Sequence, residues 1–135
     1  MTFLFLVKLY FSSVVVFFTL DMIWIGLVAS GFYRSQIGSL LRPDFNWLGA
    51  VIFYLIFIAG VEYFAILPSV AKGSAFQAAI SGALFGLVTY ATYDLTNYAT
   101  MKDFPLILAL VDMAWGTLLS CMVTVAGYFF ATRML

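Results

Sequence analysis

Four long apolar runs, separated by short polar breaks, constrain this chain more than any other feature of its sequence. They cover roughly residues 3–30, 47–67, 75–98 and 105–131. Each run has at least the ~20 consecutive apolar residues that an α-helix needs to cross the hydrocarbon core of a bilayer. A transmembrane β-barrel would instead show alternating segments of about ten residues, and these runs do not alternate. The sequence therefore predicts an all-α integral membrane bundle of four transmembrane helices.

The composition of the 135-residue chain agrees with this fold class. Hydrophobic residues make up 65% of the chain and charged residues 9%, whereas a soluble domain carries about a quarter charged residues. The first run contains Asp21 and is too long for the apolar region of a signal peptide, so we expect it to be a mature helix. No linker or low-complexity tract divides the chain, which predicts a single four-helix transmembrane domain over residues 1–135.

Charge and residue usage narrow the expected partners and cofactors. The net charge is zero and the basic residues form no cluster, so we expect the lipid bilayer as a partner and no nucleic acid. The absence of histidine removes the usual ligands of di-iron, haem and zinc sites. The single cysteine, Cys121, is expected to be a small packing residue. We therefore expect no cofactor, while a bound proton or small cation remains open and the sequence identifies no metal.

The breaks between the runs carry turn and capping residues. Asp44 or Asn46 is placed to cap the second helix before Trp47. Pro68 is expected to end that helix and Ser74 to cap the third. Aromatic residues near the loops, such as Tyr33, are expected to be interfacial anchors.

The orientation of the helices in the membrane is weakly encoded. Four crossings place both termini on one side, and the basic residues are divided equally between the two sides: Arg34, Arg42 and Lys102 against Lys8, Lys72 and Arg133. We expect the termini to be cytoplasmic. Glu62 lies near the end of the second helix on the side of the termini, where we expect it at the interface, close to Lys72.

Three acids on three different helices are expected at a similar depth. Asp21, Asp94 and Asp112 lie roughly 13, 6 and 10 Å from the face that carries the first and third loops, at 1.5 Å per residue. An acid near the bilayer centre costs ~2.5–3.5 kcal/mol on insertion scales, so all three should face the bundle interior. Neighbouring carboxylates need a shared proton, a bound cation or a basic partner, for which Arg34 and Lys102 are the candidates.

Small residues predict how the last two helices pack. Four-residue steps back from Asp94 pass through Tyr90, Gly86, Gly82, Ala78 and Ser74, and steps forward from Asp112 pass through Gly116, Ser120, Thr124 and Tyr128. Stripes of this kind allow two helix backbones to approach closely in a membrane. We expect these two helices to meet along the stripes, with Asp94 on the packing face.

The candidate polar pocket combines the three acids with neighbouring polar and aromatic residues. An Asp-Met-x-Trp motif occurs at 21–24 and again at 112–115, on helices that run in opposite directions, as inverted repeats do in many transporters. The expected pocket residues are Asp21, Trp24, Tyr90, Asp94, Asn97, Asp112 and Trp115. The competing interpretation is a buried network of salt bridges and hydrogen bonds that only fixes helix register.

Several segments together resemble a family of small bacterial membrane proteins, the one catalogued as domain of unknown function 2177. These segments are LDMIWIGLVASGFYRSQIGSLL, FYLIFIAGVEYFAILP, ALFGLVTYATYDLTNYATMKDFPL and LVDMAWG, with YATYDLTN and VDMAWG the most specific parts. The resemblance implies a four-helix protein of the bacterial inner membrane. It implies no activity.

Three functions remain in competition. The first is a small carrier or channel-like protein with an acid-lined pocket that responds to a proton or cation, expected as a homodimer because four short helices enclose little volume. The second is an accessory or assembly subunit of a membrane complex. The third is an intramembrane enzyme with paired aspartates, which is disfavoured because the Gly-x-Gly-Asp motif of membrane aspartyl proteases is missing before Asp112. The substrate is not identified.

Overall fold

The computed structural model describes all residues from 1 to 135 and contains helices, turns and short loops. The elements in chain order are α1 (Phe3–Trp24), the π-helical turn η1 (Ile25–Ala29), α2 (Ser30–Ile37), the 3-10 turn η2 (Gly38–Leu40), α3 (Trp47–Val61), the π-helical turn η3 (Glu62–Ile66), α4 (Leu67–Lys72), α5 (Ala75–Thr100) and α6 (Leu106–Arg133).

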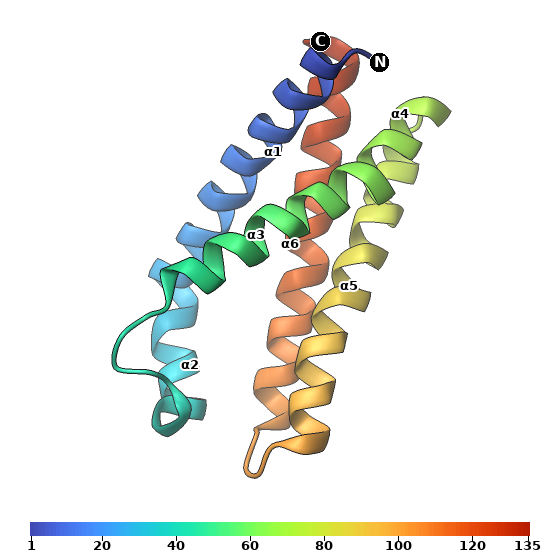
Figure 1. The fold of residues 1–135 in the computed structure, drawn as a ribbon. Coiled ribbons are helices and arrows are strands. Elements are labelled where there is room, and N and C mark those ends of the chain that lie inside the picture. Colours follow the sequence, from blue (N-terminus) through green and yellow to red (C-terminus); the bar gives the residue numbers. More distant parts are fainter.

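Several of these elements join end to end, so the chain forms four continuous helical spans that run from one end of the bundle to the other (Figure 1). The four continuous spans are Phe3–Leu40, Trp47–Lys72, Ala75–Thr100 and Leu106–Arg133, each long and apolar enough to cross a membrane. Both termini lie at the same end of the bundle (Figure 1). The predicted all-α bundle of four transmembrane helices is confirmed.

Two helices extend further than the sequence indicated. The first span continues through η1 into α2 and so reaches Ile37, beyond residue 30, and the second continues past Pro68 to Lys72. In η3 the backbone N–H of Leu67 donates to the carbonyl of Glu62, one residue further back than in an α-helix. Pro68 therefore falls in the first turn of α4, a position at which proline is common.

The helix ends are set by local signals. Gly73 adopts the left-handed conformation, with φ 63°, and ends α4. Ser74 caps α5 by accepting a hydrogen bond from the backbone N–H of Gln77 at 3.0 Å, as expected. Of the two candidate caps before α3, Asn46 takes the role, since its side chain accepts from the N–H of Gly49 at 3.2 Å.

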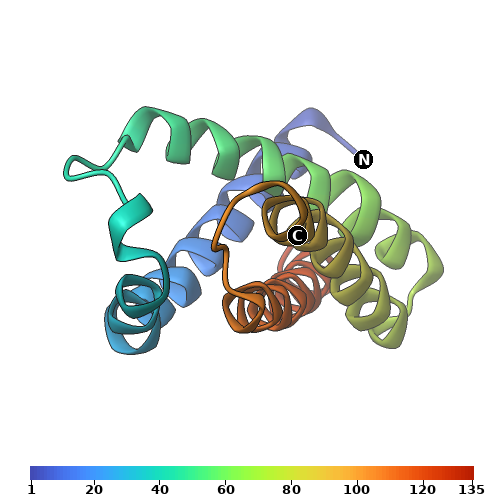
Figure 2. The same cartoon turned by 90° about the horizontal axis from the view of Figure 1, so that it is seen from below.

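Helices α5 and α6 pack along the predicted small-residue stripes and lie side by side in both views (Figures 1 and 2). Gly82 faces Ser120 and Thr124, and Gly86 faces the backbone of Gly116. Because glycine has no side chain at these positions, the two backbones come close together. This close pair forms the frame against which α1 and α3 pack.

The core and the outer surface follow the logic of a membrane protein. Buried apolar residues from α1, the α3–η3 segment and α6 form one cluster: Leu9, Phe17, Phe57, Ile58, Val61, Ile66, Leu119, Val123 and Ala131. Many large apolar side chains are exposed, such as Phe3, Leu27 and Phe76 at 82%, 81% and 77%. Lipid tails are an apolar solvent for such surfaces, so their exposure carries no hydrophobic cost in a bilayer.

Candidate functional site

Asp21 is buried near the end of α1, where donors from two other helices hold its carboxyl group. The hydroxyl group of Tyr54, on α3, donates to Oδ2 at 3.0 Å. The indole N–H of Trp115, on α6, donates to Oδ1 at 3.1 Å. Only 5% of Asp21 is exposed. One carboxyl group therefore ties three transmembrane helices together, with each of its oxygens occupied.

Asp112 accepts a hydrogen bond from α2, the helix that extends the first span. The hydroxyl group of Tyr33, on α2, donates to its Oδ1 at 2.6 Å. This hydroxyl in turn accepts the indole N–H of Trp24 at 3.4 Å. Phe32 and Ile37, on either side of Tyr33, pack against the cluster of Phe104, Leu108 and Ala109 at the start of α6. That apolar contact places Tyr33 over Asp112.

The two Asp-Met-x-Trp motifs interlock. The rings of Trp24 and Trp115 stack with centroids 4.5 Å apart and planes inclined by 7°. Trp115 donates to Asp21 directly, whereas Trp24 reaches Asp112 through the hydroxyl group of Tyr33. Each aspartate is thus connected by hydrogen bonds to the tryptophan of the other motif. The opposite directions of α1 and α6 bring the two motifs face to face for these contacts.

Asp94 is the least satisfied of the three acids. It is 1% exposed, and its Oδ2 has no hydrogen-bonding partner. Asp112, on the facing helix α6, is the acid that lies close to it. Two ionised carboxylates offer only acceptors, so a hydrogen bond between them requires a proton on one of the two.

A cavity of about 360 Å³ lies beside this network, between α1, α2, α3, α5 and α6. Five of the expected pocket residues line it: Asp21, Trp24, Tyr90, Asp112 and Trp115. The Tyr90 ring lies against the backbone of α6 at Gly116, where a Cβ atom would collide with it. The cavity thus combines two carboxyl groups with aromatic walls, a surface suited to a small organic cation.

The remaining residues of the sequence prediction lie outside this arrangement. Asp94 and Asn97 do not line the cavity, and Asn97 is half-buried without a side-chain hydrogen bond to the acids. Arg34 and Lys102 are exposed, and neither is among the hydrogen-bond donors to Asp21 or Asp112. No three acids in the chain lie close enough together to hold a metal ion.

The sequence reasoning missed Tyr33 and Tyr54. The sequence predicts that Tyr33 lies beyond the end of the first helix as an interfacial anchor. In the structure the helix continues through η1, and Tyr33 contacts Asp112. Tyr33 lies four residues after Ala29 and nine after Trp24. This spacing does not give the direction of its side chain unless the π-helical turn is known. Tyr54 left a weak signal, as the one hydroxyl-bearing residue in the apolar run of α3.

The fold and the site together define a polytopic α-helical membrane protein with a buried carboxyl network beside an aromatic cavity. The sequence pattern of the family described as "Predicted membrane protein (DUF2177)" matches residues 6–129, and the chain belongs to this family. The resemblance noted in the sequence is confirmed. No curated protein and no solved structure matches the chain.

Proposed function

We propose that the protein is a small proton-coupled carrier of the bacterial inner membrane. In this proposal the pair Asp94–Asp112 takes up and releases the proton, and the cavity beside Asp21 receives the solute. The observation that carries the proposal is the buried Oδ2 atom of Asp94, which has no partner within the chain, on a residue that lies close to a second acid, Asp112. Buried acids inside a membrane bundle commonly belong to proton relays or ion pathways.

The chemistry of the walls supports a proton and an organic cation over a metal ion. The acids do not form a set of metal ligands, and the stacked pair Trp24–Trp115 offers broad aromatic faces. A cation over an indole face is attracted by the ring quadrupole, most strongly where water is excluded. Release of the proton from Asp94–Asp112 would leave a negative charge beside the cavity, which favours entry of the cation.

Coupling would follow from the connections between the two parts of the site. Asp112 both faces Asp94 and accepts from Tyr33, and Tyr33 accepts from the Trp24 indole. A change in the charge of the pair is therefore transmitted to one ring of the aromatic stack through two hydrogen bonds. We further propose a homodimer with cytoplasmic termini, since the cavity beside Asp21 occupies only the half of the bundle that faces the loops at 41–46 and 101–105.

A proton-flux assay on proteoliposomes provides the test. Gradients of methylammonium, guanidinium or tetramethylammonium are applied to the reconstituted protein while an enclosed pH-sensitive dye records proton movement. At least one cation is expected to drive proton counterflow, and the flow should be lost in Asp94→Asn and Asp112→Asn. Asp44→Asn is the matched control, because Asp44 is an exposed acid in the first loop.

Stability measurements on the same variants separate transport from a purely structural role. The carrier proposal expects the helical content and the unfolding of Asp94→Asn to resemble the unmodified protein. Loss of folding in both variants, together with absence of proton flow for every cation in the unmodified protein, would instead favour the register-fixing network.

The contact between Asp94 and Asp112 favours one second candidate, an aspartate-dependent intramembrane enzyme. Two carboxyl groups that share a proton can act as general acid and general base on a water between them. Cleavage of a membrane-embedded peptide that is lost in both aspartate variants would support this function. An accessory role would be favoured by a stoichiometric protein partner that copurifies from the membrane.

A further inference from the structure

A fourth membrane acid, Glu62, lies at the other end of the bundle and takes no part in the site described above. The sequence placed it at the interface, close to Lys72, but this prediction is wrong: only 7% of Glu62 is exposed, and its Oε2 has no hydrogen-bonding partner. Glu62 is the first residue of η3, whose extra residue per turn shifts the side chains that follow. Lys72 is exposed at the end of α4.

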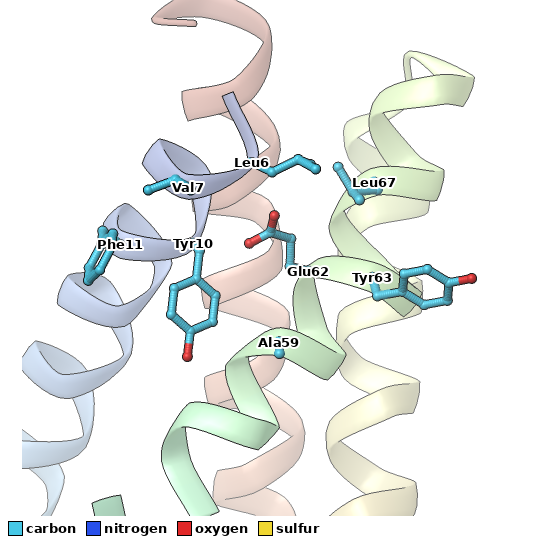
Figure 3. Close-up of a pocket in the computed structure, with 8 residues that line it drawn as sticks. All are labelled: Leu6, Val7, Tyr10, Phe11, Ala59, Glu62, Tyr63 and Leu67. Atoms are coloured by element: carbon cyan, nitrogen blue, oxygen red, sulfur yellow. The ribbon is translucent and has the colours of Figure 1, made fainter. Parts of the chain in front are cut away.

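Glu62 points into a second cavity, of about 330 Å³, between the start of α1 and the α3–η3–α4 span. The close-up shows the carboxyl group directed into the space between the two spans, with Leu6 and Leu67 extending toward each other above it (Figure 3). Seven of the eight lining residues are hydrophobic. The hydroxyl group of Tyr10 is already engaged, since it donates to the carbonyl of Leu55 at 2.8 Å.

The cavity opens sideways, toward the membrane. Phe11 and Tyr63 stand at its edge and are 62% and 68% exposed. Both belong to apolar spans that are long enough to cross a membrane, so lipid surrounds them. A molecule dissolved in the bilayer can therefore reach Glu62 without entering water. The carboxyl oxygen Oε2 that it meets there is buried and has no partner.

We propose that this cavity binds a lipophilic primary amine in its protonated form, with the ammonium group on Glu62 and the alkyl chain between Leu6 and Leu67. An ionised carboxylate in an apolar cavity needs donors to offset its lost hydration, and the chain supplies none to Oε2. An ammonium group supplies up to three N–H donors and the opposite charge. The apolar walls match an alkyl chain, and the lateral opening matches a ligand that partitions into membranes.

This site is separate from the one assigned to the carrier function. The two cavities share no lining residue, and Glu62 lies at the end of the bundle near the termini. Binding of the amine therefore does not depend on Asp94 or Asp112. The alternative is that Glu62 is simply protonated and neutral, in which case an alcohol of the same chain length should bind as well as the amine.

The test is a radioligand binding measurement with dodecylamine on the protein in phosphatidylcholine nanodiscs, with empty nanodiscs subtracted. We expect saturable binding of one amine per chain. Glu62→Gln keeps the shape of the side chain and removes its charge, and should weaken binding by at least about tenfold. Asp44→Asn, which changes an exposed acid in the first loop, should bind like the unmodified protein, and dodecanol should compete poorly.

A second variant covers the case in which Glu62→Gln does not fold. Ala59→Leu adds bulk to the wall of the cavity without touching the charge, and it should also reduce dodecylamine binding. Undiminished binding in folded Glu62→Gln or in Ala59→Leu would overturn the proposal, as would competition by dodecanol equal to that of the amine. Loss in every one of the two variants that folds, with Asp44→Asn unaffected, would support it.

Discussion

Replacement of Gly86 by alanine tests the packing that brings Asp94 and Asp112 together. A Cβ atom at Gly86 would collide with the backbone oxygen of Gly116 and lie 2.6 Å from Oγ and 2.7 Å from Cβ of Ser120. Ordinary contacts of a Cβ atom begin near 3.4 Å. Because a backbone oxygen cannot swing aside as a side chain can, α5 and α6 must move apart.

The size of the effect follows from this displacement. A separation of about 1 Å forfeits roughly a quarter to a half of the van der Waals attraction along the contact, and overpacking of this kind costs typically ~1–3 kcal/mol. We expect Gly86→Ala to lower the free energy of unfolding by about 3 kcal/mol, at the upper end of that range. It should also separate Asp94 from Asp112, since both lie on the same contact.

Two glycines provide graded controls. A Cβ atom at Gly60 would lie 2.8 Å from the tip of the Phe85 ring, which can rotate away, so Gly60→Ala should cost only about 1 kcal/mol. At Gly31 no atom lies within 4 Å of the added Cβ, so Gly31→Ala should change stability by less than about 0.5 kcal/mol.

The measurement is unfolding by increasing mole fractions of sodium dodecyl sulfate in mild detergent micelles, followed by circular dichroism. The expected order of stability is Gly31→Ala, then Gly60→Ala, then Gly86→Ala. If Gly86→Ala unfolds at the same detergent fraction as Gly31→Ala, the two backbones are not in close contact and the placement of the aspartate pair is wrong.

Three further predictions concern the hydrogen-bond network. Trp115→Phe removes the indole donor to Asp21 and should lower stability by about 1–2 kcal/mol in the same titration; unchanged stability would show that the bond contributes nothing. Tyr33→Phe removes the donor to Asp112 and should cost about 1 kcal/mol, with a shift in tryptophan emission as the indole environment changes; an unaltered spectrum would contradict the link through Tyr33. Asp94→Asn should leave stability within about 1 kcal/mol of the original, because the replaced oxygen has no partner; a large loss would indicate a structural partner for that oxygen.

Much of the fold could be predicted because it depends on properties that each residue carries locally. The four spans follow from the length and apolar character of the runs, since backbone groups in lipid must satisfy one another within a helix. The α5–α6 contact could be predicted because the small residues recur every four positions, which places them on one face of a helix whatever surrounds it. Asp94 on the buried contact face follows from the same count.

The two π-helical turns could not be predicted from the sequence. They account for most of the differences between the predicted and the observed positions of side chains. Each inserts a residue into a turn and so changes which face every later side chain occupies. Tyr33 comes to Asp112 and Pro68 remains inside a helix only because of these turns. The same shift at η3 begins with Glu62, which lies buried rather than at the interface.

The sequence by itself determined the membrane class and the four spans, because hydropathy and helical rise are properties of one segment at a time. Tertiary structure alone decided the partners of the three acids: two oxygens of Asp21 occupied by Tyr54 and Trp115, one oxygen of Asp94 left without a partner, and two exposed basic residues that stay outside the network. The hydrogen-bonding partners of the acids depend on the rotation of each helix about its axis and on the angles at which the four helices cross. That rotation is set by close contacts between residues far apart in the chain. The hydropathy of a single segment does not depend on those contacts and therefore cannot predict the rotation.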